Sequence, residues 1–116
     1  MIFNKTRRRI AAKTHSVCSS VLSKAKGLMF STRKDIEDNA LIFPFSKRQR
    51  VGLHMFFVFY PIDVLFLDAH KRVVEEKRRF LPFTAYNSKN SCNYVLELEA
   101  GAIERSKTKI GDVFEW

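Results

Sequence analysis

The chain has 116 residues, of which 46% are hydrophobic, and it carries a formal net charge of +9. This length predicts one domain with a core of its own, and the low content of glycine and proline argues against a disordered chain. Two cysteines are too few for the disulfide framework of a small secreted scaffold, so we expect a reduced, cytoplasmic protein.

The positive charge lies in the N-terminal third. Residues 1–34 contain nine Lys or Arg and no acid, whereas residues 35–116 contain twelve bases and twelve acids. We interpret residues 1–9 as a basic N-terminal extension and residues 10–116 as a single β-rich domain. The densest cluster, Arg7, Arg8 and Arg9, is a candidate polyanion site. Neither stacking aromatics nor a DNA-binding motif accompanies it, so we expect weak, non-specific binding to nucleic acid. A merely solubilising basic end is the alternative.

The first predicted elements are a strand within residues 8–18 and a short helix. Ser19 or Ser20 can cap this helix, which would run to Lys26 and end at Gly27. The polar residues 31–39 predict a loop or a single helical turn.

The middle of the chain is rich in apolar residues. ALIFPF at 40–45 predicts a strand stopped by Pro44, and residues 46–52 predict a basic turn. The run LHMFFVFY at 53–60 is typical of a strand buried on both faces, which Pro61 would end.

The last predicted elements are strands joined by turns. VLFLD at 64–68 leads through a hairpin turn at Asp68–Arg72 to a partner strand over residues 72–81. A further strand over residues 94–100 ends at Gly101. The chain then closes with a turn at Gly111–Asp112 and a short strand.

Regularly spaced strands of this kind predict a mainly β fold. We expect a compact single-domain β-sandwich or barrel-like structure with one short N-terminal helix. Phe57 and Phe66 are predicted to lie in its core.

Asp63 lies inside the most apolar segment of the chain. A buried carboxylate must be hydrogen-bonded or neutralised. Asp63 is therefore either a structural latch that accepts backbone N–H groups or the polar anchor of a pocket. Glu97 and Glu99 share one face of their strand, and we interpret this face as its solvated side, with an acidic binding spot as the alternative.

The sequence contains no nucleophile elbow, phosphate-binding loop, dinucleotide-binding or zinc-protease motif. His15, His54 and His70 lie in separate regions of the chain, so we predict no metal site and no cofactor. The apolar segment Leu53–Leu67 has only 15 residues and is interrupted by Pro61 and Asp63. It is too short for a transmembrane helix.

Four stretches in order form a recognisable pattern: KGLMF at 26–30, PIDVLFLD at 61–68, YVLELEAG at 94–101 and IGD at 110–112. Together they resemble the prokaryotic domain of unknown function 192, also catalogued as uncharacterised protein family 0127, across about residues 10–114. The resemblance implies a compact β-sandwich-like domain and no known activity. The matching motif positions are Gly27, Leu28, Met29, Pro61, Asp63, Gly101, Gly111 and Asp112.

The chain departs from the pattern of that family at two places. His54–Met55 is followed by Phe56 and Phe57 where bacterial members have polar residues, and Glu99 replaces the usual proline. Many members of the family carry an export signal or a membrane anchor. The opening residues here are basic but are not followed by the apolar run of a signal peptide.

We therefore predict a small, non-enzymatic β domain that binds a ligand or a protein partner. The candidate binding residues are His54, Met55, Asp63 and Glu97. The alternative is an enzyme in which Asp63 and His54 form an acid–base pair, which requires an approach of about 3 Å, directly or through one water. Weak nucleic-acid binding through the basic N-terminal third is the third hypothesis.

Overall fold

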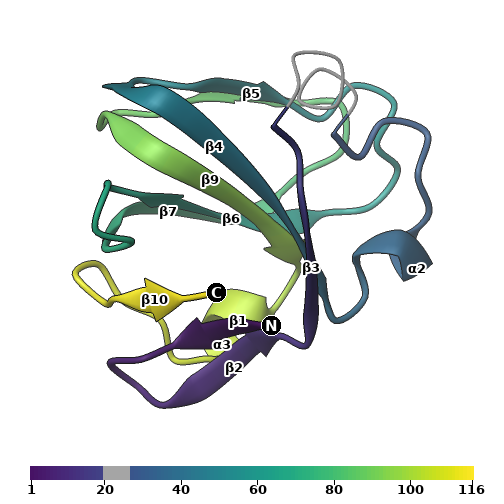
Figure 1. The fold of residues 1–116 in the computed structure, drawn as a ribbon. Helices are drawn as coiled ribbons and strands as arrows, with labels where there is room; N and C mark the ends of the chain where they lie inside the picture. Colours follow the sequence, from purple (N-terminus) through teal and green to yellow (C-terminus); the bar gives the residue numbers. More distant parts are fainter. Residues whose placement is uncertain (20–26) are drawn as a thin grey trace.

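A computed structural model describes residues 1–19 and 27–116 of the chain (Figure 1). Its largest sheet has the strand order β3-β4-β9-β6-β7. These strands are β3 (Thr14–Val17), β4 (Asn39–Gln49), β9 (Cys92–Glu99), β6 (Ile62–Leu67) and β7 (Val73–Phe80). The pairs are antiparallel except for β3 with β4, which is parallel.

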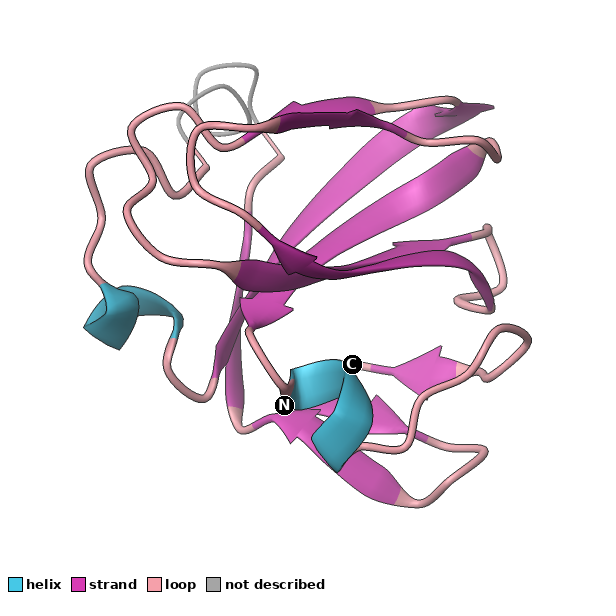
Figure 2. Ribbon diagram, turned by 180° about the vertical axis from the view of Figure 1, so that it is seen from behind, coloured by secondary structure: helices cyan, strands magenta, loops and turns pink. Residues whose placement is uncertain are grey.

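Two smaller sheets flank the large one. The first has the order β10-β1-β2 and consists of β1 (Ile2–Asn4), β2 (Arg9–Ala12) and β10 (Phe114–Glu115). The second pairs β5 (Gly52–His54) with β8 (Ala85–Asn87). Figure 1 shows β5 above the large sheet, and β1, β2, β10 and the short helix α3 (Ala102–Arg105) below it. The helical turn α2 (Arg33–Ile36) lies to one side, as the view from behind in Figure 2 also shows. The predicted mainly β fold is confirmed.

The large sheet is buried on both faces because each face has its own apolar cluster. All six residues of β6 are buried. Leu65 and Leu67 pack toward the three-stranded sheet and α3, whereas Ile62, Val64 and Phe66 pack on the opposite face. This alternation follows from the two-residue period of a strand.

The N-terminal third differs in detail from the expectation. Residues 8–18 form two strands, β2 and β3, rather than one. The helix predicted from Ser19 or Ser20 to Lys26 lies outside the described residues. Gly27, which follows it, has a positive φ of 48°. Residues 2–4, within the segment interpreted as a basic extension, form β1, and Ile2 is fully buried in the core.

Pro44 does not stop β4, so that prediction is wrong. The strand continues to Gln49, with an irregular register after Pro44, and thereby includes residues 46–49 of the predicted basic turn. The strand β3 pairs with β4 only as far as Ile42. At Pro44, therefore, β4 has β9 as a neighbour on one side and no paired strand among the described residues on the other. Proline is tolerated where a strand lacks a partner, because its missing N–H is not needed there.

The prediction of a strand over residues 53–60 is also wrong. The strand β5 ends at His54, and the backbone then turns: the carbonyl of Met55 accepts the N–H groups of Val58 and Phe83. Phe57 has a φ of 59° and is 45% exposed, so it does not lie in the core. Phe66 is fully buried, as predicted.

The later turns and strands are confirmed. The carboxylate of Asp68 accepts the N–H groups of His70 and Arg72, which closes the predicted hairpin between β6 and β7. The segment 31–39 contains the single helical turn α2, in which Thr32 and Asp35 form a capping box. Within the described residues, no helix is both long and apolar enough to cross a membrane.

Candidate functional site

A cavity of about 320 Å³ lies on the face of the large sheet that β5 covers. Its walls come from β4, β5, β9, the loop after β5 and the segment just before α2. Most lining side chains are apolar, and one is a carboxylate. The lining residues are Gly27, Leu28, Met29, Phe43, Phe45, Val51, Gly52, Leu53, His54, Met55, Val58 and Glu97.

The cavity brings together three of the four predicted binding residues, His54, Met55 and Glu97. It also includes Gly27, Leu28 and Met29, a family motif far from them in the sequence. The remaining apolar lining was not predicted as part of a site. These residues were interpreted as strand interior and turn, and only the tertiary fold brings them around Glu97.

Glu97 is buried, which contradicts the interpretation of its strand face as solvated. It is 7% exposed and lies in β9 between its cross-strand neighbours Leu41 of β4 and Val64 of β6. Among the described residues, no hydrogen bond or ion pair engages its carboxylate. Burial raises the pKa of Glu97 to about 7. The cavity therefore has an ionisable group that changes its charge near neutral pH.

Replacement of Glu97 by glutamine should stabilise the fold at high pH. Between about pH 4.5 and 7 the carboxyl group of Glu97 is ionised in the unfolded chain but still protonated in the folded one. The free energy of unfolding of the wild type therefore falls as the pH rises through this range and stays low above it. A shift of this size corresponds to about 3 kcal/mol, and the amide escapes that cost. We expect Glu97→Gln to raise the free energy of unfolding at pH 8 by up to about 3 kcal/mol, and much less at pH 4.5.

Urea unfolding of both proteins at pH 4.5, 6 and 8 measures this difference. Glu104→Gln, at an exposed position, is the matched control and should show no such trend. A stability difference for Glu97→Gln that does not change with pH would contradict the burial of an unpaired carboxylate.

His54 and Met55 occupy different parts of the cavity wall. Met55 is 1% exposed, whereas His54 is exposed at the end of β5. The Nδ1 atom of His54 accepts the N–H of Phe56 at 3.3 Å, and the two rings stack with centroids 4.9 Å apart. Met55 is therefore a buried part of the lining and His54 an exposed one.

Asp63 acts as the structural latch that the sequence left as one of two options. One carboxylate oxygen accepts the N–H of Arg79 at 3.0 Å. The other accepts the N–H groups of Gly101 and Ile103 at 3.0 and 3.1 Å. These contacts tie β6 to the end of β7 and to the start of α3, where Gly101 adopts a φ of 95° that favours glycine. Asp63 does not line the cavity.

The acid–base hypothesis required Asp63 and His54 to approach one another. One carboxylate oxygen of Asp63 binds two backbone amides at the start of α3 and the other binds the N–H of Arg79 in β7, whereas His54 lines the cavity on the β5 side. Within the described residues no hydrogen bond joins the two side chains. The geometry does not support that pair.

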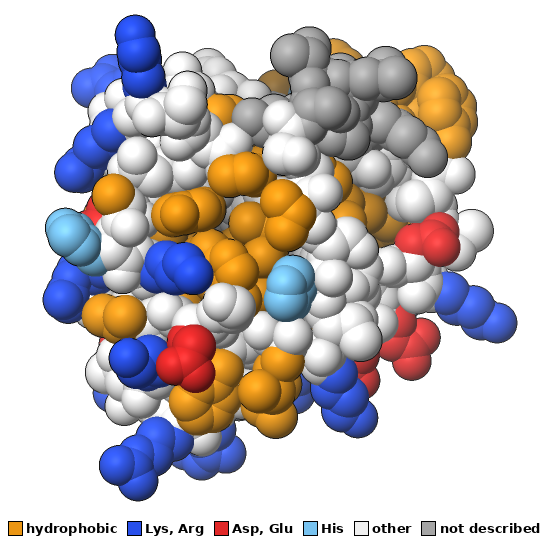
Figure 3. Space-filling view, viewed as in Figure 1, with side chains coloured by type: hydrophobic (Ala, Val, Ile, Leu, Met, Phe, Trp, Pro, Cys, Tyr) orange, Lys and Arg blue, Asp and Glu red, His pale blue; other side chains and the backbone are white. Residues whose placement is uncertain are grey.

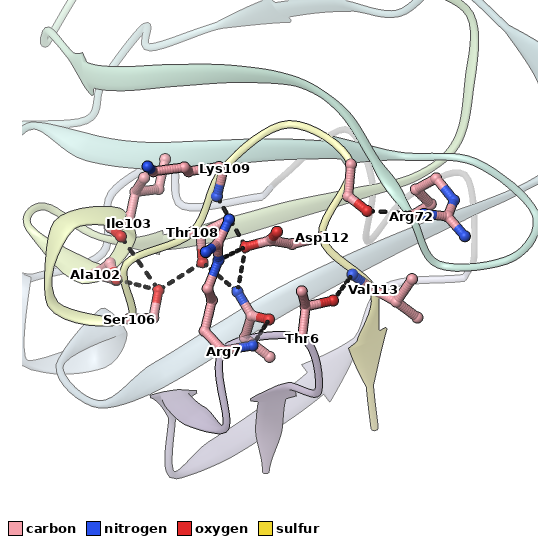
Figure 4. A network of polar contacts seen from close by, with 12 residues as sticks. Thr6, Arg7, Arg72, Ala102, Ile103, Ser106, Thr108, Lys109, Asp112 and Val113 are labelled. Carbon is pink, nitrogen blue, oxygen red and sulfur yellow. Dashed lines mark hydrogen bonds and ion pairs between the residues drawn. The ribbon is translucent and has the colours of Figure 1, made fainter.

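Asp112 is the centre of a second structural network (Figure 4). Its Oδ2 atom accepts hydrogen bonds from Asn4 Nδ2, Arg7 Nε and the N–H of Lys109, each at 3.0 Å. Burial alone would raise the pKa of Asp112, but the hydrogen bonds from Arg7, Asn4 and Lys109 outweigh it and lower this pKa. Arg7 is thus an ion-pair partner that holds the two ends of the chain together, while Arg8 and Arg9 remain exposed.

A fourth buried carboxylate, Glu75, was not predicted to have a role. Its carboxylate accepts hydrogen bonds from the hydroxyl of Tyr86, from the N–H groups of Lys89 and Asn90 and from the side-chain amide of Asn90. The hydrogen bond to Glu75 raises the pKa of Tyr86 to about 12. This network fixes the connection between β8 and β9. The described residues contain no group of three or more His, Cys, Asp or Glu side chains that could hold a metal ion.

A family model and similar curated proteins place the chain in the same family. The profile of the DUF192 family, described as Uncharacterized ACR, COG1430, matches residues 2–116. A UPF0127 protein of Thermococcus sibiricus is 31% identical over 118 residues, which cover 100% of this chain and 74% of that protein. A UPF0127 protein of Pyrococcus horikoshii is 31% identical over 116 residues, covering 100% and 98% of the two chains.

Two solved structures share the fold at 25% sequence identity. A protein of unknown function from Novosphingobium aromaticivorans has a TM-score of 0.79, covering 88% of this chain and 74% of that one. A proposed transcription regulator from Sinorhizobium meliloti has a TM-score of 0.80, covering 87% and 79%.

Proposed function

Since this chain belongs to the DUF192 family, whose description gives no activity, we propose a function from its cavity: it binds a small molecule with an apolar body and one cationic or hydrogen-bond-donating group. The apolar lining would hold the body of the ligand, and Glu97 would bind its polar group. The size of the cavity, about 320 Å³, is at the lower end of the range for small-molecule sites.

The buried carboxylate of Glu97 is the observation that carries this proposal. A carboxylate in apolar surroundings is costly unless it is neutralised or hydrogen-bonded, and Glu97 finds no such partner among the described residues. A ligand that supplies an N–H donor or a cation would remove this cost on binding. Such a polar group among apolar walls is typical of small-molecule sites.

Two further residues support binding by the cavity. The thioether of Met55 is flexible and polarisable, so it suits a wall that adjusts to an apolar ligand. The exposed His54 can interact with the part of the ligand that remains near solvent. We propose binding rather than catalysis because the other buried carboxylates, Asp63, Asp112 and Glu75, are held by structural hydrogen bonds.

A pair of matched probes tests the charge preference. Benzylamine and benzoate have the same apolar ring and opposite charges. In a ¹H–¹⁵N NMR titration at pH 8, benzylamine should shift the resonances of cavity residues at lower concentrations than benzoate does, because Glu97 is then mostly ionised.

The same titration of Glu97→Gln should show no preference for the amine, because the negative charge is absent. Val51→Trp, which places a large side chain at the cavity wall, should weaken the binding of both probes. Equal binding of benzoate and benzylamine to the wild type, or shifts confined to residues away from the cavity, would contradict the proposal.

Weak binding to nucleic acid is a second candidate function. The structural neighbour from Sinorhizobium meliloti is described as a proposed transcription regulator, and Arg8 and Arg9 lie exposed in and beside the turn between β1 and β2. Phosphate contacts of this kind give dissociation constants of roughly 10⁻⁴–10⁻⁶ M and depend strongly on salt. Arg7 contributes less, because it is paired with Asp112.

The double substitution Arg8→Gln/Arg9→Gln should weaken this binding and reduce its salt dependence. Fluorescence anisotropy with single- and double-stranded oligonucleotides at two salt concentrations measures both effects. Lys47→Gln/Arg48→Gln, which removes two exposed cations of β4, is the matched control and should retain more of the binding. Binding that is tight, salt-resistant or selective for one sequence would make nucleic acid the principal ligand instead.

We further propose a cytoplasmic location. Cys18 and Cys92 are free thiols, and burial raises the pKa of each. Cysteines that are not joined in a disulfide are typical of proteins from a reducing compartment.

A further inference from the structure

Four phenylalanine side chains form an exposed cluster, which we name the aromatic patch: Phe30, Phe57, Phe59 and Phe83. Their exposed fractions are 69%, 45%, 63% and 50%. Phe30 stacks on Phe57 at 4.9 Å between centroids, and Phe83 meets Phe57 and Phe59 edge-on at 6.1 and 5.4 Å. Contiguous apolar surface of this kind is characteristic of an interaction site.

The backbone holds these rings outward. Phe30, Phe57 and Phe83 have φ values of 60°, 59° and 59°, a region that large side chains rarely adopt. Hydrogen bonds between the three segments fix this arrangement. The N–H of Phe30 donates to the carbonyl of Phe57 at 2.8 Å, and the N–H of Phe83 donates to the carbonyl of Met55 at 2.8 Å. Strained conformations that the surrounding structure maintains are concentrated at functional sites.

Figure 3 shows hydrophobic side chains at the surface at its upper right, on the side where Figure 1 draws the loop between β5 and β6. The segments that carry the aromatic patch, residues 27–34, 54–60 and 77–83, contain five Lys or Arg, and the exposed Asp35 follows the first of them. Of the five cations, Lys77 lies over the ring of Tyr86 and Arg78 is paired with Glu76. Arg33, Lys34 and Arg79 are exposed and make none of the ion pairs found between described residues. The patch is therefore apolar, with three exposed cations close to it in the chain and one neighbouring acid.

We propose that the aromatic patch docks the protein on an anionic lipid surface. The phenylalanine rings would enter the boundary between headgroups and acyl chains, and Arg33, Lys34 and Arg79 would contact the acidic headgroups. Apolar rings beside flexible cations are the combination that holds peripheral proteins on such surfaces. This proposal does not depend on the ligand of the cavity.

Charge and ring geometry favour lipid over the other possible occupants. A symmetric contact between two copies would place the same unpaired cations opposite one another, which is repulsive. Nucleic-acid bases bind by stacking on open ring faces, and the stacking of Phe30 on Phe57 leaves each of these rings only one free face. An anionic lipid surface matches both the cations and the ring edges.

Co-sedimentation with phosphatidylcholine vesicles, with and without phosphatidylglycerol, tests the proposal. The wild type should bind the anionic vesicles, and added salt should weaken this binding. The double variant Phe59→Ser/Phe83→Asn should bind at least about tenfold more weakly, because two rings no longer leave water. Asparagine suits position 83 because it tolerates a positive φ.

Two further variants distinguish the patch from general stickiness. Ile110→Ser removes an apolar side chain that is 57% exposed outside the patch and should bind as the wild type does. Arg33→Gln/Lys34→Gln should lose the preference for anionic vesicles. Failure of the wild type to bind anionic vesicles would overturn the proposal, as would equal binding by the wild type and the double phenylalanine variant. A dimer broken by that same double variant would assign the patch to a second copy and would also overturn it.

Discussion

The substitution Asp63→Ala is expected to lower the free energy of unfolding by about 3–5 kcal/mol. Alanine removes the acceptor of three N–H groups, those of Arg79, Gly101 and Ile103, of which the bond from Ile103 is fully buried. Each of these contacts is a charge-assisted hydrogen bond, the stronger kind, and water has little access because Asp63 is 2% exposed. A loss of this size is a large part of the roughly 5–15 kcal/mol that stabilises a domain.

Urea unfolding monitored by circular dichroism measures this loss. Asp63→Asn is the informative comparison, because its amide keeps one acceptor oxygen and should restore part of the stability. Glu104→Ala is the surface control and should change the unfolding free energy by less than about 0.5 kcal/mol. If Asp63→Ala unfolds at the same urea concentration as the wild type, Asp63 is not the latch described above.

The second large effect is expected for Phe66→Ala, at about 3–5 kcal/mol of destabilisation. Phe66 is fully buried within β6, and the centroid of its ring lies 6.0 Å from that of Tyr86. Its removal would leave a cavity in a close-packed layer between the large sheet and β8. Phe57→Ala, which removes a ring that is 45% exposed, should cost less than about 1 kcal/mol.

Urea melts of the two variants should be compared directly. Both replace phenylalanine by alanine, so the effect of the substitution on the unfolded chain is nearly the same and cancels in the comparison. The midpoint for Phe66→Ala should fall well below that of Phe57→Ala. Equal midpoints would mean that the two rings have similar surroundings and would contradict the turn that exposes Phe57.

The sequence identified the elements whose signals are local. Asp68 begins a turn whose hydrogen bonds reach only two and four residues along the chain, and the apolar run before it forms β6. The loop after β5 is also rich in apolar residues, as β6 is, but it does not form a strand. Its backbone is bonded to a distant segment instead, through the N–H of Phe83 and the carbonyl of Met55. That contact joins distant segments, so hydrophobic pattern alone could not separate a buried strand from an exposed aromatic loop.

The candidate site was predicted in part for the same reason. His54, Met55 and Glu97 were chosen from the sequence, and all three line one cavity. The alternation around Glu97 is the pattern of a half-solvated strand, yet residues 27–29 and 51–58 cover that face. The two interpretations of Asp63 could not be separated, because its partners lie 16, 38 and 40 residues away in the chain.

Native mass spectrometry of the protein purified from its own host tests most directly whether the cavity around Glu97 is a binding site. We predict that the wild type carries a small molecule that dissociates on denaturation, and that this mass is absent or strongly reduced in Glu97→Gln and Val51→Trp purified in the same way. Asp63→Asn, which alters the latch outside the cavity, should retain the molecule if it is folded. A wild-type mass equal to that of the bare chain, or an adduct kept equally by both cavity variants, would contradict the proposed function.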